Sequence, residues 1–193
     1  MITGNVVFKD MSENNGSVTG DANFDDGSSN NGKIIGNVDF KDTSENNGTV
    51  IGDTNFIDTA TNNKIIEGDA SFSNNSINIG LIIGNSTFND SSKNSDEGTI
   101  DGVTTFNDNT ENSGAVMDDC IFNDNSQNKG VVDKNATFNN YSENSGNVNG
   151  IGTTNDHSNN KGFIDTIDQY DDSTHDEDGG GTYNFVMIED TES

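Results

Sequence analysis

The chain has 193 residues, of which only 27% are hydrophobic, and its formal net charge at pH 7 is −26. This composition argues against nucleic-acid binding, which needs clustered lysine and arginine, and against docking on an anionic membrane surface. Low hydrophobicity with high net charge is also typical of disorder, so a folded interpretation needs a positive signal.

That signal is a repeat of sixteen residues that begins with the first residues of the chain. A repeat of this length is too short to bury its own apolar face, so successive units are expected to stack. Thr154 and Tyr170 occupy the last two positions of the phenylalanine series. The earlier positions are sixteen residues apart, with one step of eighteen across the segment 93–98, and are Phe8, Phe24, Phe40, Phe56, Phe72, Phe88, Phe106, Phe122 and Phe138.

Two further series keep the same period and share the parity of the phenylalanines, because every fixed position is even-numbered. Valine or isoleucine stands six residues before each phenylalanine, as in Val18, Ile34, Val50, Ile66 and Ile82. Asparagine stands six residues after it, as in Asn14, Asn30, Asn46 and Asn62. Period-two patterning is typical of extended chain. We therefore predict an all-β fold, a single-chain β-solenoid (β-helix) of about ten sixteen-residue coils with inward Phe and Val/Ile ladders.

Two corners of each coil are predicted from turn-forming residues. Gly-Asn or Gly-Asp pairs such as Gly4-Asn5 and Gly20-Asp21 favour tight turns with positive φ. The glycine is replaced by Asp118 and Lys134 in later coils, which suggests that this position points outward. The second corner is expected in the D-x-S-x-N-x-G segment, where stacked asparagines would bond to one another.

An aspartate follows each phenylalanine by two residues in most coils, as at Asp10, Asp26 and Asp42. Carboxylates stacked about 4.8 Å apart repel one another, so a dry inward column is disfavoured. Either the chain turns there and the carboxylates reach water, which we favour, or cations lie between them. We expect no cofactor, and Ca²⁺ is the one ion that this series leaves open.

The remaining chemistry-bearing residues fit no catalytic pattern. Cys120 lies in a small-residue position of the repeat and is expected to be a buried, inert thiol. His157 and His175 are far apart and are expected at the surface. No metal-ligand, nucleophile or phosphate-loop motif occurs, so we predict no catalytic residues, no metal site and no enzymatic activity.

The repeat fades near the C-terminus, which divides the chain into three predicted parts. Residues 1–170 form the solenoid, residues 171–181 an acidic and glycine-rich linker, and residues 182–193 a capping or partner-binding strand. The apolar residues of this last part are Tyr183, Phe185, Val186, Met187 and Ile188. At the other end no cap is expected over the first coil, and exposed strand edges favour assembly.

The units at 19–32 (TGDANFDDGSSNNG) and 134–146 (KNATFNNYSENSG) resemble the tandem sixteen-residue repeats of phage fibre proteins, especially those of marine and cyanobacterial phages, and of large bacterial surface proteins. The resemblance covers residues 2 to about 168 and implies a stalk, spike or adhesive surface. No catalytic residue is carried over with it.

These observations give a structural or attachment protein as the expected function, a rigid element of a virion fibre or capsid decoration. The start of the chain lacks a signal peptide and no segment is apolar enough to span a membrane, so we expect localisation to a virion or an extracellular surface. The alternative is a fragment of a secreted bacterial adhesin or filament subunit. Third comes an ice-binding β-helix, disfavoured because the regular residues point inward, or a polysaccharide-acting one, disfavoured because the insertions are too small to build a groove with aromatic sugar platforms. Expected partners are other copies of the chain, other structural proteins of a virion or surface, and a host surface glycan.

Overall fold

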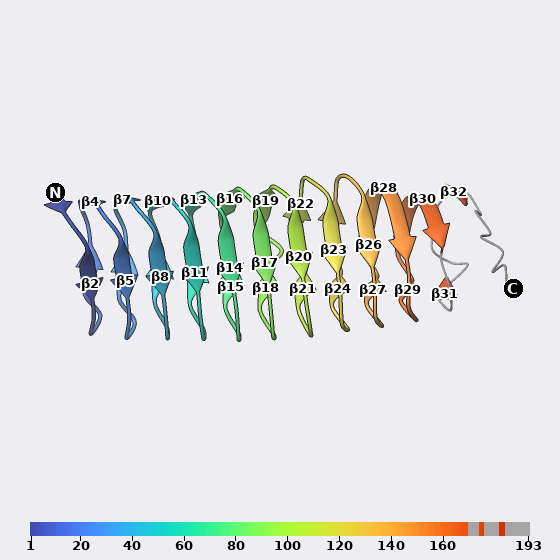
Figure 1. Ribbon diagram of the computed structural model, residues 1–193, viewed down its shortest axis with the longest axis horizontal. Coiled ribbons are helices and arrows are strands. Elements are labelled where there is room, and N and C mark those ends of the chain that lie inside the picture. Colours follow the sequence, from blue (N-terminus) through green and yellow to red (C-terminus); the bar gives the residue numbers. More distant parts are fainter. Residues whose placement is uncertain (170–173, 176–181, 184–193) are drawn as a thin grey trace, which may run out of the picture.

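The computed structural model describes residues 1–169, 174–175 and 182–183, and every structural statement below concerns these residues. It shows an all-β parallel solenoid of about ten coils, with no helix in the described part of the chain. Figure 1 shows the coils side by side along one axis, in the order of the sequence from β2 (Val6–Phe8) to β30 (Phe163–Gln169). The predicted fold class is confirmed.

Each regular coil contains three short strands, because the alternating inward and outward positions are interrupted by three bends. The first strand carries the inward Val or Ile. Its members are β1 (Ile2–Thr3), β4 (Ser17–Thr19), β7 (Lys33–Ile35), β10 (Thr49–Ile51), β13 (Ile65–Glu67), β16 (Leu81–Ile83), β19 (Thr99–Asp101), β22 (Ala115–Val116) and β25 (Val131–Val132).

The second strand ends on the inward phenylalanine. Its members are β2, β5 (Ala22–Phe24), β8 (Val38–Phe40), β11 (Thr54–Phe56), β14 (Ala70–Phe72), β17 (Ser86–Phe88), β20 (Thr104–Phe106), β23 (Cys120–Phe122) and β26 (Ala136–Phe138). In the last coils the first and second strands merge into β28 (Asn147–Thr154) and β30, and β32 (Thr182–Tyr183) pairs with β30.

The third strand is two residues long and ends on the inward asparagine in every coil but the last described one, where it ends on His175. Its members are β3 (Glu13–Asn14), β6 (Ser29–Asn30), β9 (Glu45–Asn46), β12 (Thr61–Asn62), β15 (Ile77–Asn78), β18 (Lys93–Asn94), β21 (Glu111–Asn112), β24 (Gln127–Asn128), β27 (Glu143–Asn144), β29 (Asn159–Asn160) and β31 (Thr174–His175). All pairings between neighbouring coils are parallel, so equivalent residues of successive coils lie one above another, as Phe56 lies on Phe72.

The core is a narrow stack of identical side chains. The phenylalanine rings from Phe8 to Phe138 form one column, with centroids 4.5–5.0 Å apart and angles of 4–16° between neighbouring planes. Beside it, Val18, Ile34, Val50 and their equivalents are fully buried. Full burial of such a side chain stabilises the fold by about 1.5–3 kcal/mol, and each coil supplies two.

The insertion at 93–98 forms a turn outside the stack. Because it adds two residues, the even-numbered residues after it still point inward. Asp96 and Glu97 form an exposed turn, and the Gly98 amide donates to the Ser95 carbonyl at 2.8 Å. Register resumes at once, with Ile100 paired to Ile82 and Asn112 to Asn94.

The last described coil departs from the predicted period. Val148 pairs with Ile164, sixteen residues on, but Thr154 pairs with Gln169, fifteen residues on, after a bulge between Val148 and Ile151. Gln169 therefore takes the position opposite Thr154, and Tyr170, which the sequence placed there, lies outside the described residues. The bulge accompanies a change of packing, because the odd-numbered Ile167 is buried opposite Gly152.

Candidate functional site

The predicted phenylalanine, valine or isoleucine, and asparagine ladders form the interior, and the asparagine ladder also links the coils by hydrogen bonds. The buried asparagines donate from one coil to the next, Asn14 Nδ2 to Asn30 Oδ1 at 2.7 Å, and the chain of bonds continues without a gap to Asn160 at 2.7–2.9 Å. Each such bond satisfies a polar group that would otherwise be buried at a cost. The asparagines also accept from the backbone two residues on, as when Gly16 N–H donates to Asn14 Oδ1 at 3.2 Å.

A buried serine or threonine in most coils, which the sequence analysis left without a role, lies between the phenylalanine and asparagine columns. Its hydroxyl reaches the phenylalanine carbonyl of the preceding coil in three cases: Ser28 to Phe8 at 3.2 Å, Ser92 to Phe72 at 3.2 Å and Ser158 to Phe138 at 3.0 Å. These bonds connect the turn of one coil to the phenylalanine strand of the coil before it.

The aspartate positions lie at tight, solvent-facing turns. From Asp10 to Asp156 these residues have φ between 48° and 63°, the left-handed region that aspartate and asparagine tolerate best. The preferred turn placement of this series is therefore confirmed. A shallow hollow of about 570 Å³ runs along it, lined by Asp58, Thr59, Asn74, Asn75, Asp90 and Ser91.

These turns occur in two forms, which differ in the direction of the peptide N–H that follows the aspartate position. Where the next residue also has positive φ, as at Met11 and Tyr141, its amide donates forward, Met11 to the Asp26 carbonyl at 3.2 Å and Tyr141 to the Asp156 carbonyl at 3.1 Å. In the central coils the amide donates backward, as when Asn75 N–H bonds to the Asp58 carbonyl at 2.8 Å. The form therefore changes twice along the rod.

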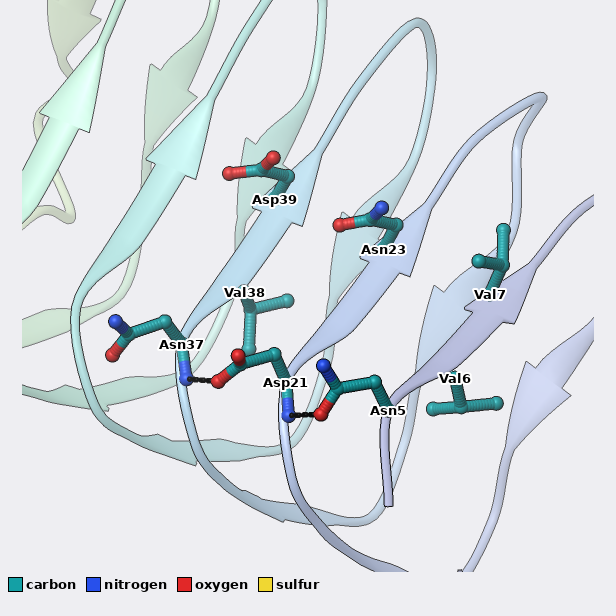
Figure 2. Close-up of a pocket in the computed structure, with 8 residues that line it drawn as sticks. All are labelled: Asn5, Val6, Val7, Asp21, Asn23, Asn37, Val38 and Asp39. Carbon is teal, nitrogen blue, oxygen red and sulfur yellow. Dashed lines mark hydrogen bonds between the residues drawn. The ribbon is translucent and has the colours of Figure 1, made fainter.

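The Gly-Asn and Gly-Asp corners carry a second row of polar contacts. Gly4, Gly20, Gly36, Gly52, Gly68 and Gly84 have positive φ, as predicted. The side chain that follows each glycine accepts from the backbone of the next coil: Asp21 N–H donates to Asn5 Oδ1 and Asn37 N–H to Asp21 Oδ1, both at 3.0 Å (Figure 2). Asparagine and aspartate both fit this position because each offers an oxygen.

The glycine position itself is more crowded than expected. A Cβ at Gly52 would collide with the backbone carbonyl of Gly36, so the glycine is not simply outward-pointing. Asp118 and Lys134 take its place where φ is not positive, and their side chains pair at 2.9 Å. This bond, from Lys134 to Asp118, lowers the pKa of the carboxyl and raises the pKa of the ammonium group.

A shallow groove lies beside these corners in the first coils (Figure 2). Its volume is about 400 Å³, and its lining includes Val7, Asn23 and Asp39, which occupy one outward row in successive strands. Lys41 pairs with Asp39 at 3.8 Å and Lys9 with Asp25 at 3.5 Å. The groove offers carboxylate, amide and apolar contacts but no nucleophile.

The cysteine, the histidines and the C-terminal apolar residues singled out in the sequence do not gather into one site. Cys120 is buried, and burial raises the pKa of its thiol well above the ordinary value. His157 stacks on the exposed Tyr141 ring, with centroids 5.1 Å apart, at a turn. His175 lies in β31, and Tyr183 in β32, whereas Phe185, Val186, Met187 and Ile188 lie outside the described residues.

No three His, Cys, Asp or Glu side chains gather to hold a metal ion in the part of the chain that the structure describes. That part also has no helix long and apolar enough to cross a membrane. Comparison of the chain with protein-family models, with curated proteins and with solved structures gives no match.

Proposed function

We propose that this chain is a rigid structural rod that spaces or attaches larger assemblies. The observation that supports this role most directly is the unbroken phenylalanine column, in which eight successive ring pairs stack without interruption. About ten coils at about 4.8 Å each give a rod about 50 Å long. Backbone and asparagine ladders bond successive coils to each other, so a sharp bend would break several hydrogen bonds at once.

The setting that we propose for this rod is a virion fibre or a capsid decoration, with other structural proteins or further copies of the chain as partners. The repeat-level resemblance supports it. The alternative is a subunit of a secreted adhesin or extracellular filament, which would use the same rod. A neighbouring gene for a phage structural protein favours the first setting, and a longer reading frame with a secretion signal favours the second.

Electron microscopy and small-angle scattering of the purified chain test the rod itself. We expect straight particles about 50 Å long, or multiples of that length if copies stack end to end. Measurements over a hundredfold range of concentration separate single rods from assemblies. Globular or flexible particles would contradict the proposal, and cleavage of a host polysaccharide by the chain would point to an enzyme instead.

A further inference from the structure

The outer face of the Phe-bearing strands changes character halfway along the rod. The middle residue of each such strand points outward, because it lies between two buried neighbours. In the first coils this row and the next outward row are mixed and partly charged, with Lys9, Asp25, Asp39 and Lys41. From Thr87 onward both rows become regular and carry no charge.

We call this regular area the Thr/Asn face. Its first row is a ladder of β-branched side chains, paired in register between neighbouring strands, and its second row lies two residues further along each chain. The first row is Thr87, Thr105, Ile121, Thr137 and Thr153, and the second row is Asn89, Asn107, Asn123, Asn139 and Asn155.

The asparagine row is held in one orientation by its own hydrogen bonds. Asn107 Nδ2 donates to Asn89 Oδ1, and each later amide donates to the one before it, all at 2.9 Å. An amide has two donors and an acceptor with two lone pairs. Each inner amide of the row therefore keeps one N–H and one lone pair for a ligand, already ordered before binding, which lowers the entropic cost of association.

The threonine row adds a methyl and a hydroxyl in each coil. Ile121, the one exception, is also β-branched and 38% exposed, so the row of branched methyl groups continues where a hydroxyl is missing. Threonine and asparagine thus form a two-dimensional grid. Its spacing along the rod is 4.7–5.0 Å, as measured by the rings beneath it, and its spacing across the rod is longer, because the two rows are two residues apart in each coil.

The partner that fits this grid must be periodic, uncharged and equally rich in donors and acceptors. Hexagonal ice has these properties, and its oxygen positions repeat along two perpendicular axes with a shorter and a longer spacing, as the grid does. A charged polymer finds no ion pair in either row. A crystalline polysaccharide is periodic too, but neither row offers an aromatic ring on which a sugar could stack.

We propose that the Thr/Asn face adsorbs to ice. The ordered amides and hydroxyls hold water in positions that continue the crystal, and the methyl groups fill the spaces between them. A bound rod then stops the growth of the crystal surface beneath it. This activity is additional to the rod-like role, which stands or falls by the shape of the particle and not by ice binding.

The test is inhibition of ice recrystallisation and thermal hysteresis, measured with the full chain and with albumin at equal mass. We expect the chain, but not albumin, to keep ice crystals small at micromolar concentrations. The paired substitution Thr105→Lys with Thr137→Lys should raise the concentration required at least tenfold. Thr105→Ser with Thr137→Ser removes only two methyl groups, preserves the fold and should raise it about threefold.

A matched control carries the same change on another face. Thr49 and Thr99 point outward from β10 and β19, so Thr49→Lys with Thr99→Lys should leave the activity within twofold of the original. Circular dichroism checks that all variants keep their strands. The proposal is overturned if the chain behaves like albumin, if the control loses as much as Thr105→Lys with Thr137→Lys, or if the chain binds crystalline cellulose without affecting ice.

Discussion

The rings of Phe72 and Phe88 lie face to face, with centroids 4.6 Å apart and 4° between their planes. Both rings are fully buried, although they belong to strands sixteen residues apart in the sequence. Offset stacking of aromatic rings contributes about 0.5–1.5 kcal/mol beyond burial of their area. The column thus gives a chain with few apolar residues a continuous core.

Truncation of one ring in the middle of this column should be costly. We expect Phe72→Ala to lower the free energy of unfolding by about 3–5 kcal/mol, because the cavity is closed on both sides by rings that have no room to move. Urea denaturation followed by circular dichroism measures the change. Ser71→Ala, on the outer side of the same strand, should cost less than about 0.5 kcal/mol, and equal effects would contradict a buried column.

Replacement of a ladder asparagine should make stability depend on pH. In Asn78→Asp the new side chain still accepts from Asn62, but its ionised form has no proton for Asn94 Oδ1, which Asn78 now serves at 2.8 Å. Burial raises the pKa of the new carboxyl above its unfolded value of about 3.9. The variant should therefore be least impaired below pH 4 and lose stability as the pH rises through the raised pKa.

Thermal unfolding between pH 3 and pH 8 checks this prediction. The control is Asn75→Asp, which places the same charge on an exposed residue of the same coil. A variant at position 78 that follows the control at every pH would show that the ladder amide is not buried in solution.

The two kinds of glycine turn should respond differently to asparagine. At position 27 the φ is 75°, and Asn125 already occupies the equivalent position at φ 67°, so Gly27→Asn should cost less than about 1 kcal/mol. At position 52 a Cβ would collide with the Gly36 carbonyl, and φ is 146°. Gly52→Asn should therefore cost about 2 kcal/mol or more through strain and overpacking. Denaturation curves of the two variants decide the matter, and a reversed order would contradict the turn geometry.

The change of turn form between the second and third coils should be visible in hydrogen exchange. Gly27 has the positive φ of the forward-donating form, whereas Thr43, like the turn residues of the central coils, does not have a positive φ. Neither amide has a hydrogen-bond acceptor in the described part of the chain. We expect both to exchange faster by nuclear magnetic resonance than the amides of Asn75 and Ser91, which donate to carbonyls at 2.8 Å. Equal protection would show that one turn form runs through all the coils.

The ion pair of Glu111 with Lys129, 2.5 Å long, should make a small contribution that disappears in acid. The hydrogen bond from Lys129, with a second one from Ser113, holds the pKa of Glu111 below its ordinary value. A lowered folded-state pKa means that the stabilisation is present above the unfolded pKa and is lost as the pH falls through the folded one. Glu111→Gln should lower stability by at most about 1 kcal/mol at pH 7 and by nothing at pH 3. Glu97→Gln, at an exposed turn, is the control in the same thermal scans.

Much of the interior could be read from the sequence, because its cause is local. In extended chain, residues two apart share a face, so the even-numbered positions of Phe24, Val18 and Asn14 already imply that all three point inward. Once units of equal length stack in register, each of these residues can only meet its own equivalent. The step of eighteen across 93–98 is also even, so it leaves these inward positions inward.

The outer surface depended on the tertiary structure. The outward residues of the coils vary along the chain, and only the register of β17, β20, β23, β26 and β28 brings the threonines and asparagines of the Thr/Asn face into two continuous rows. Asn107 and Asn123 are sixteen residues apart, and nothing local shows that their amides bond.

By itself, the sequence determined which side chains are inside, since period and parity are properties of a single extended strand and survive any detail of the turns. Only the tertiary structure decided how the corners are built: which way each turn peptide faces, why Gly52 is crowded, and where the last coil shortens to fifteen residues. Those features depend on contacts between residues of neighbouring coils, which are about sixteen residues apart in the sequence and meet only when the coils stack.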